Sequence, residues 1–322
     1  MDGVDLVTGA FGNAGSAIAA QLGEQGRAVR TLTTRSPEGG EPTDIEVRPL
    51  DWDDATALKD AFDGVETFYN TYWMRLGDRH GSYDLAVQRC FQLIEAAESA
   101  GVERILHVSI AHASHRSAYP YFRAKAKVEE RLELSDVPTL VVRPTLLFGG
   151  QSVLLNNLAW ALRKLPVFAV AGRGDYRVRP IHVDDLARLC VLGPHLDDEP
   201  EVHVDRLIDA SPHLVVDAVG PDRPTYMDLV REIRHATGSR VLIVRTPTPA
   251  VLAGSRLIGA LVRDQVLDRD ELVSTVKGLA DTEGPPTGST SLLGWIRDHA
   301  GDLGHHYHNE RTSRPVPAGE ST

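Results

Sequence analysis

Apolar segments alternate with helical periods through the first half of the chain. Short runs such as "VDLVT", "AVRTLTT", "ETFYNTY", "RILHVSI" and "TLVVRP" are separated by segments with helical spacing, such as "SAIAAQLGEQG" and "DLAVQRCFQLIEAAESAG". This alternation is typical of parallel strands joined by helices that cover both faces of one sheet. The pattern therefore predicts an α/β fold with a doubly wound, Rossmann-type parallel sheet.

The rhythm changes after Gly150. A long helical segment, "VLLNNLAWALRKLP", precedes the Gly- and Arg-rich stretch "AGRGDYRVRPIHVDD", and a further helical portion begins near Thr225. We expect a dinucleotide-binding domain from residues 1–150 and about 177–221, and a smaller, mainly helical substrate domain from residues 151–176 and about 222–311. Residues 312–322 are rich in Pro, Ser and Gly and lack an apolar face, which predicts a disordered tail.

Composition restricts the classes of partner. The 322 residues are 42% apolar and 25% charged, with a formal net charge of -11. A negative chain disfavours binding to nucleic acid or anionic membranes, so a small-molecule substrate is expected. Cys90 and Cys190 each lie in an apolar, helix-like run and are interpreted as buried thiols. No signal segment or long apolar run is visible, which predicts a cytoplasmic protein. The sequence leaves open whether the protein is a monomer or a homodimer.

A glycine pattern lies between the first predicted strand and the first predicted helix. Gly9, Gly12 and Gly15 form the pattern T-G-x-x-G-x-x-G in "VTGAFGNAG". Glycine at these positions permits a tight turn and a close approach of backbone to a pyrophosphate at the helix N-terminus. Together with the intervening Phe11 and Asn13, these residues are predicted to bind a dinucleotide.

The end of the second predicted strand bears on the choice between NAD and NADP. Thr33 stands where an NAD enzyme carries an acidic residue for the ribose 2′-hydroxyl, and Thr34 and Arg35 follow directly. The Arg35 guanidinium could clamp a 2′-phosphate, so NADP(H) is favoured over NAD(H). The alternative is an ordinary surface arginine.

The segment "YPYFRAKAKVEE" follows the fifth predicted strand and has helical composition. Tyr121 and Lys125 are four residues apart and therefore share one helical face, whereas Tyr119 has Arg123 at that offset. The glycine pattern upstream favours a cofactor-facing role for this pair over a solvated helix surface.

Five motifs occur in a characteristic order: "TGAFGNAG", "PLDWDD", "YFRAK" with its following "VEE", "RPTLLFG" and "IHVDDLA". Together they resemble the atypical and extended short-chain dehydrogenase/reductases. The resemblance is greatest to the branch of NmrA-like and complex I accessory-subunit-like proteins, and to actinobacterial NAD(P)-binding epimerase/dehydratase-like proteins. It runs from Val4 to about Arg311.

The resemblance implies further cofactor contacts at the ends of other strands. They concern the adenine, the ribose and pyrophosphate, and the nicotinamide amide. Tyr72 and Trp73 could equally be packing residues or line a substrate pocket. The implied positions are Asp51 and Trp52 for the adenine, Asn70, Thr71 and Tyr72 for the ribose and pyrophosphate, and Pro144, Thr145 and Leu147 for the nicotinamide.

The resemblance also implies that Tyr121 is the catalytic acid/base and that Lys125 assists it and holds the nicotinamide ribose. A phenol with an ordinary pKa of about 10 is activated by a neighbouring ammonium group, which favours the ionised form. The family usually adds a Ser or Thr at the end of the fifth strand, where Ala111 stands here. Ser109 shares that strand face and is the predicted substitute; Ser114, His112 or His115 are alternatives from the loop.

These features predict an NADP(H)-dependent oxidoreductase acting on a carbonyl or alcohol of a small organic molecule. An epimerase or dehydratase that uses the cofactor transiently is a related alternative. A non-catalytic NADP-binding sensor or scaffold is the alternative from another class, consistent with Ala111 and the NmrA-like resemblance. No metal is expected, because "HVDD" (182–185) and "HHYH" (305–308) lack enough further ligands nearby.

Overall fold

The computed structural model describes residues 3–33, 44–74, 82–150, 152–192, 212–262 and 269–308. Two compact units divide the chain. One contains Met1–Pro144 and Val183–Ala218, and the other contains Thr145–His182 and Val219–Val316. The chain thus leaves the first unit, returns for Val183–Ala218, where the described residues form one helix and one strand, and leaves again. The sequence placed these changes near residues 150, 177 and 221, and the roles of cofactor and substrate domain remain predictions.

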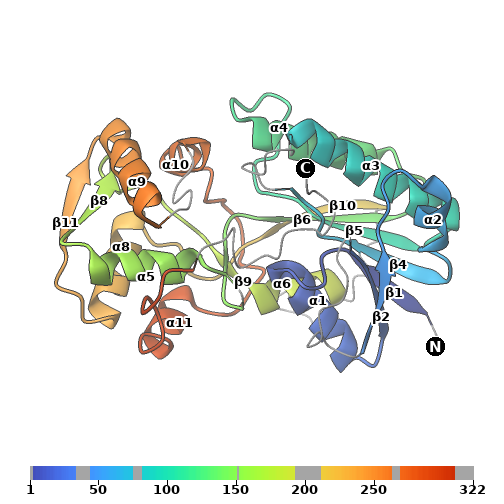
Figure 1. Ribbon diagram of the computed structural model, residues 1–322, viewed down its shortest axis with the longest axis horizontal. Coiled ribbons are helices and arrows are strands. Elements are labelled where there is room, and N and C mark those ends of the chain that lie inside the picture. The colour runs from blue at the N-terminus through green and yellow to red at the C-terminus, as the bar shows by residue number, and fades with distance from the viewer. Residues whose placement is uncertain are drawn as a thin grey trace. The chain divides into compact units, whose positions relative to one another are not determined.

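The first unit is built on one parallel sheet of seven strands in the order β10-β6-β5-β4-β1-β2-β3 (Figure 1). Every neighbouring pair runs parallel. The predicted doubly wound, Rossmann-type fold is therefore confirmed. The strands are β1 (Val4–Val7), β2 (Ala28–Thr33), β3 (Ile45–Pro49), β4 (Val65–Asn70), β5 (Arg104–Val108), β6 (Thr139–Pro144) and β10 (His213–Ala218).

Helices cover both faces of this sheet. The helices α1 (Asn13–Glu24) and α6 (Val183–Leu192) pack together on one face, and α2 (Ala55–Asp60), α3 (Tyr83–Ala100) and α4 (Pro120–Glu133) pack on the other (Figure 1). The core against α3 contains Phe62 and Phe68, whose fully buried rings meet edge to face at 5.0 Å. Central strands buried on both faces explain why their sequences are continuously apolar.

The order of strands reverses between β1 and β4. The chain proceeds from β1 outward to β2 and β3, then crosses back to β4 and proceeds outward to β5 and β6. In doubly wound sheets, ligands bind beyond the carboxyl ends of the strands at this switch point. The glycine turn after β1 and the polar residues that end β4 meet there.

The second unit is mainly helical and has its own core. Strand β7 (Leu147–Phe148) pairs with β9 (Ile181–His182), and β8 (Val167–Ala171) pairs with β11 (Leu242–Thr246). Fully buried core residues include Phe148, Val230 and Ile296. The helices are α5 (Leu154–Lys164), α8 (Tyr226–Ala236), α9 (Thr248–Val262), α10 (Arg269–Val276) and α11 (Leu292–Asp298).

Three further expectations from the sequence concern particular segments. Cys90 and Cys190 are free and buried, as predicted. In the ranges that the structure describes, no helix combines the length and the apolar character needed to cross a membrane. The expected tail at residues 312–322 lies outside the described residues.

The short helix α2 gives a test of local stability. Asp54 caps its N-terminus, and its Oδ1 accepts hydrogen bonds from the backbone N–H groups of Thr56 (3.0 Å) and Ala57 (2.9 Å). We expect Asp54→Ala to lower the free energy of unfolding by about 1 kcal/mol, measured by urea denaturation. Asp53→Ala is the control, because it removes the same charge one residue before the cap. An equal loss in both variants would contradict a capping role.

Candidate active site

The glycine turn after β1 is close-packed in a way that excludes side chains. Gly9 has a φ of 66°, and its carbonyl oxygen accepts a hydrogen bond from Gly12 N–H at 2.7 Å. A Cβ on Gly15 would lie 2.1 Å from the Gly9 oxygen, so α1 can approach the turn only with glycine there. The α1 N-cap, Gly12, has no side-chain cap. Phe11 and Asn13 are half-buried at the same turn. This cradle fits a dinucleotide pyrophosphate.

Thr8 joins this turn to the end of β4. Its Oγ1 accepts hydrogen bonds from the backbone N–H groups of Thr71 (3.0 Å) and Tyr72 (3.2 Å), and the Thr71 hydroxyl donates to the Thr8 carbonyl. The Thr8 side chain is buried. The hydroxyl groups of Thr8 and Thr71 therefore join the two chain segments that flank the switch point.

The residues expected at the adenine end follow β2 and β3. Thr33 ends β2, and its carbonyl accepts a hydrogen bond from Leu50 N–H at 2.9 Å. Trp52 packs against Tyr72 with ring centroids 5.1 Å apart and lies 4.8 Å from the Arg89 guanidinium carbon. Asp51 is exposed and accepts a hydrogen bond from the Asp53 backbone N–H. Thr34 and Arg35 lie outside the described residues.

Two polar side chains are fully buried at the carboxyl ends of β4 and β5. Asn70 Oδ1 accepts a hydrogen bond from Tyr72 N–H at 3.1 Å, whereas its Nδ2 makes no hydrogen bond within the described part of the chain. Neither ring nitrogen of His107 makes a hydrogen bond that satisfies normal geometry with a described residue. Burial first, and the charge of Lys125 second, hold the pKa of His107 well below its usual value. His107 is therefore neutral.

Lys125 lies on the inner face of α4 and is 3% exposed. Its Nζ donates a hydrogen bond to the Val108 carbonyl at 2.9 Å and lies 4.1 Å from the centroid of the Trp73 ring. Burial lowers the pKa of Lys125 to about 8, although the nearby Cys90 and Glu129 act in the opposite direction. Its ammonium group therefore loses its proton in a pH range where an exposed lysine stays charged.

Tyr121 stands one turn before Lys125 and shares its neighbour Trp73. The two rings meet nearly at right angles with centroids 5.8 Å apart, and Tyr83 lies 5.9 Å from Tyr121. Tyr121 is half-buried. The structure therefore brings the predicted Tyr–Lys pair against a common aromatic neighbour at the carboxyl edge of the sheet. Trp73, for which the sequence left packing and pocket roles open, contacts both members.

Ser109 has a partner that the sequence did not predict. Its hydroxyl donates to Glu129 Oε1 at 2.5 Å, and Glu129 also receives a bidentate pair of hydrogen bonds from Arg143. Ser109 and Glu129 are both buried. A substrate-binding role for Ser109 would require this contact to open. Ala111, at the usual Ser/Thr position, is fully buried, and the following His112 has a φ of 60°, which is rare for a non-glycine residue.

The three residues expected beside the nicotinamide divide between the two units. Pro144 ends β6 in the first unit, and Thr145 begins the second. The Thr145 hydroxyl donates to the Arg179 carbonyl at 2.5 Å, and Leu147 pairs with Ile181 in the β7–β9 ladder. In the structure, Thr145 and Leu147 therefore hold the second unit's own backbone, and their role toward the cofactor remains a prediction.

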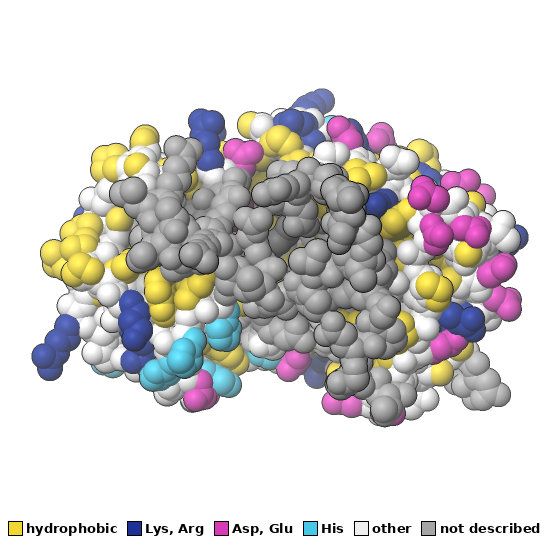
Figure 2. Space-filling view, in the orientation of Figure 1, with side chains coloured by type: hydrophobic (Ala, Val, Ile, Leu, Met, Phe, Trp, Pro, Cys, Tyr) yellow, Lys and Arg dark blue, Asp and Glu magenta, His cyan; other side chains and the backbone are white. Residues whose placement is uncertain are grey.

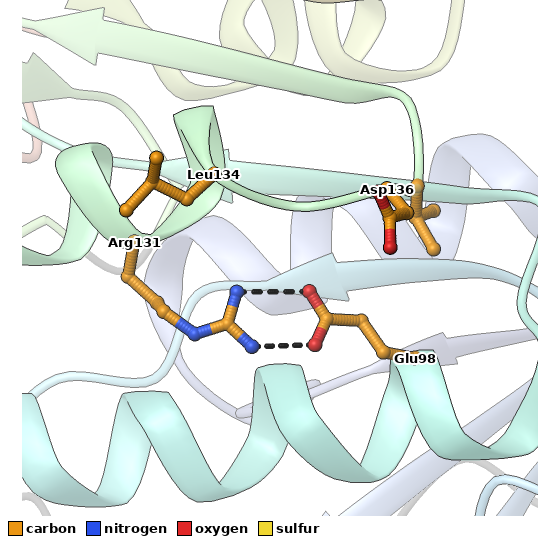
Figure 3. A pocket seen from close by; sticks show the side chains of 5 residues that line it. Glu98, Arg131, Leu134 and Asp136 are labelled. Atoms are coloured by element: carbon orange, nitrogen blue, oxygen red, sulfur yellow. Dashed lines mark hydrogen bonds and ion pairs between the residues drawn. The ribbon is translucent and has the colours of Figure 1, made fainter.

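A hollow of about 350 Å³ lies away from the predicted site. It is lined by Glu98, Arg131, Leu134, Asp136 and Val137, beside the N-terminal end of β6 and hence at the edge of the sheet opposite the glycine turn. Arg131 and Glu98 form a bidentate ion pair across the hollow (Figure 3). Because the charges of Arg131 and Glu98 are already paired with each other, this hollow fits a structural role.

The histidine-rich segment near the end of the described chain is a packed turn. The Asn156 and Asn157 amides donate to the carbonyls of His306 and His308, both at 2.9 Å, and Tyr307 packs on Trp160 at 5.1 Å. Histidine side chains gather beside α11 on the face drawn in Figure 2, where acidic side chains gather over α2 and α3. Within the described ranges, no three His, Cys, Asp or Glu side chains are arranged to hold a metal ion.

The residues that surround Lys125 were not predicted from the sequence. Cys90 and His107 face it from α3 and β5, and Glu129 follows it on α4. A signal existed only for Glu129, which stands four residues after Lys125 in "VEE". The contributions of Cys90 and His107 depend on which strands and helices are neighbours, which local spacing does not reveal.

Burial of Lys125 predicts a specific dependence of stability on pH. Unfolded Lys125 keeps its proton up to its ordinary pKa of 10.5, whereas folded Lys125 releases it near 8. Between these values unfolded Lys125 binds more protons than folded Lys125, so this residue alone contributes a rise of about 3 kcal/mol in the free energy of unfolding. The buried thiols of Cys90 and Cys190 contribute in the opposite direction but are common to both proteins, so denaturation measured across this range should show the stability of the wild type relative to Lys125→Met rising by about 3 kcal/mol. Lys127→Met, at an exposed position, should retain the wild-type profile.

Comparisons with known proteins agree with this geometry. Residues 9–156 match the NAD(P)H-binding family. The chain is 28% identical over 262 residues to the ceramide reductase of Caulobacter vibrioides, covering 80% of this chain and 78% of that protein. It is 27% identical over 142 residues to the mitochondrial NADH dehydrogenase [ubiquinone] 1 alpha subcomplex subunit 9 of Rattus norvegicus, covering 43% of this chain and 38% of that protein.

A solved structure extends the likeness of fold to most of the chain. The NADPH-dependent quinone oxidoreductase of Escherichia coli, complexed with NADPH, superposes with a TM-score of 0.71 at 20% identity, covering 93% of this chain and 100% of that chain. The sheet order, the glycine turn at the switch point and these matches agree on a nicotinamide-cofactor fold. The resemblance found in the sequence motifs is confirmed, since residues 9–156 match the NAD(P)H-binding family and the chain is similar to a ceramide reductase and to a complex I accessory subunit.

Proposed function

We propose that this protein is an NADP(H)-dependent oxidoreductase that acts on a carbonyl or alcohol of a small organic molecule. The observation that carries the proposal is the convergence of Tyr121 and Lys125 on Trp73 at the carboxyl edge of the sheet. That edge also bears the glycine turn, in which Gly15 leaves no room for a side chain. A pyrophosphate cradle and a Tyr–Lys pair on one ligand-binding edge are the two parts that this chemistry requires.

The roles of the residues follow from their chemistry. Bound NADP(H) supplies the hydride in reduction and accepts it in oxidation. Tyr121 donates its phenolic proton to the carbonyl oxygen in reduction and takes the alcohol proton in oxidation. Lys125, while protonated, would stabilise the phenolate form of Tyr121 by its positive charge.

The preference for NADP(H) rests on the end of β2. Thr33 carries no charge, so it does not repel a 2′-phosphate as the acidic residue of an NAD site would. Arg35, two residues later in the sequence, supplies the positive charge in this proposal. The ceramide reductase and NADPH-dependent quinone oxidoreductase named above support an oxidoreductase. The second unit would supply the substrate contacts.

A non-catalytic sensor that binds NADP(H) is the second candidate, and a specific observation favours it. Ala111 stands at the usual Ser/Thr position, and the hydroxyl of Ser109 is bound to Glu129. A site that lacks such a donor can lose about 10²- to 10³-fold in turnover. An epimerase or dehydratase that uses the cofactor transiently shares the same residues.

The two classes are distinguished by binding and turnover measured on the same purified protein. Binding of NADPH and NADH is followed by nicotinamide fluorescence, and turnover by nicotinamide absorbance with a panel of quinones, ketones and aldehydes. The oxidoreductase predicts tighter binding of NADPH than NADH and loss of NADPH absorbance with at least one class of substrate. Tight binding without turnover on the whole panel would establish the sensor instead.

A further inference from the structure

Glu129 connects three elements of the first unit at the level of the predicted Tyr–Lys pair. It lies on α4, one turn beyond Lys125, and is 9% exposed. Its carboxylate accepts from the Ser109 hydroxyl just beyond β5 and from both Arg143 Nε (3.0 Å) and Arg143 Nη2 on β6. A carboxylate removed from water is retained only when its oxygens are paired in this way. The network therefore fixes the position of α4 against two strands.

We propose that Glu129 is a positioning residue that holds the Lys125 face of α4 toward the cofactor edge and supplies the negative charge that keeps Lys125 protonated. The inference rests on the proposed function, because Lys125 must be charged to assist Tyr121. It also assigns Ser109 to the Glu129 network and not to the substrate.

The groups around Lys125 differ in charge near neutral pH, and this difference makes Glu129 the group that stabilises the lysine ammonium. Cys90 faces Lys125 from α3, and burial raises the pKa of that thiol to about 11, so it is neutral near pH 7. His107 faces it from β5 and is neutral, because burial and the Lys125 charge lower its pKa. Tyr121 stands one turn earlier on α4, β4 ends at the uncharged Asn70, and the loop after β4 contributes Trp73. Of the described groups that act on Lys125, Glu129 is therefore the one that is negative near neutral pH.

Arg143 gives the inference its sharpest test. Glu129→Gln and Arg143→Gln break the same ion pair, so a purely structural role predicts similar effects of the two changes. Their electrostatic effects on Lys125 are opposite. Removing the carboxylate leaves an unpaired guanidinium and disfavours the charged lysine, whereas removing the guanidinium leaves an unpaired carboxylate and favours it.

The pKa of Lys125 can be measured directly because the chain contains five lysines, Lys59, Lys125, Lys127, Lys164 and Lys277. Protein labelled with ¹³C at lysine Cε is titrated by NMR from about pH 6 to about pH 11, and Lys125→Arg identifies the Lys125 signal. The wild-type midpoint is expected at about 8. We expect Glu129→Gln to lower this midpoint by roughly 1 unit and Arg143→Gln to raise it.

Each outcome decides the inference. A lower Lys125 midpoint in Glu129→Gln together with a higher midpoint in Arg143→Gln supports the inference. Any other pair of results, including shifts in the same direction or no shift, overturns it. If Glu129→Gln does not fold, Arg143→Gln decides alone, because a lowered or unchanged midpoint contradicts the proposal. The titration needs no cofactor and no substrate. Absence of turnover in the wild type would therefore refute the proposed function without affecting the titration. Conversely, a titration that overturns the role of Glu129 would not by itself refute the proposed function.

Discussion

Tyr121→Phe is expected to lower turnover by about 10²- to 10⁴-fold while leaving NADPH affinity close to that of the wild type. The change removes one hydroxyl group and keeps the ring that packs against Trp73 and Tyr83. The aromatic contacts and the fold should therefore persist, and the loss should appear in the step that transfers the proton. Single-turnover measurements with NADPH and an active substrate test this, since they separate that step from product release.

Tyr119→Phe is the matched control for this experiment. Tyr119 stands two residues earlier in the same segment, at the N-cap of α4, with Arg123 and not lysine at the four-residue offset. Its ring packs on Phe122 with centroids 5.9 Å apart. Turnover in this variant should remain at the wild-type level. If the two substitutions reduce turnover equally, the acid/base role assigned to Tyr121 is wrong.

Gly15→Ala is expected to weaken binding of NADPH and NADH alike, by up to about 10²-fold. The added Cβ would meet backbone atoms of the turn, namely the Gly9 oxygen at 2.1 Å and the Gly9 carbonyl carbon at 2.6 Å. Backbone cannot rotate away as a side chain can, so the turn must open or α1 must shift. Overpacking of this kind destabilises the native turn by about 1 to 3 kcal/mol. A free-energy difference of about 1.4 kcal/mol corresponds to a tenfold change in affinity.

Gly23→Ala supplies the control within the same helix. Gly23 is exposed in α1, and a Cβ there would meet nothing within 4 Å. Because alanine is the better helix former, this variant should gain up to about 1 kcal/mol of stability with unchanged cofactor affinity. Isothermal titration with NADPH compares the two variants. Normal affinity in Gly15→Ala would mean that the cofactor does not bind at this turn.

The fold of the first unit follows from local patterns in the sequence. Apolar runs predicted the strands, and segments with helical spacing predicted the helices between them. The alternation predicted a parallel sheet, because both faces of such a sheet must be covered by helices. The glycine turn was also predictable from the pattern of Gly9, Gly12 and Gly15. Gly9 has a φ of 66° and Gly15 packs against backbone, and both constraints require glycine at those positions in the sequence. Tyr121 and Lys125 were predicted to share a helical face because their spacing is fixed by the helix itself.

The contacts that join distant elements were not predictable in the same way. Ser109 was expected to serve a substrate because of its strand face, yet it binds Glu129, twenty residues later. Arg143 completes that network from a third element. Which side chains meet across β5, α4 and β6 depends on register and helix orientation, which no short motif encodes. The same holds for Trp73, whose contact with Lys125 joins the loop after β4 to α4.

The return of the chain to the first unit has a consequence for its synthesis on the ribosome. The edge strand β10 pairs with β6 along its full length, and α6 packs on α1, yet both are translated only after residue 182. A nascent chain that ends before Val183 lacks the helix that covers α1 and the strand that pairs with β6. Co-translational folding of the complete first unit must therefore wait for the ribosome to pass Ala218, well after its first 144 residues have emerged.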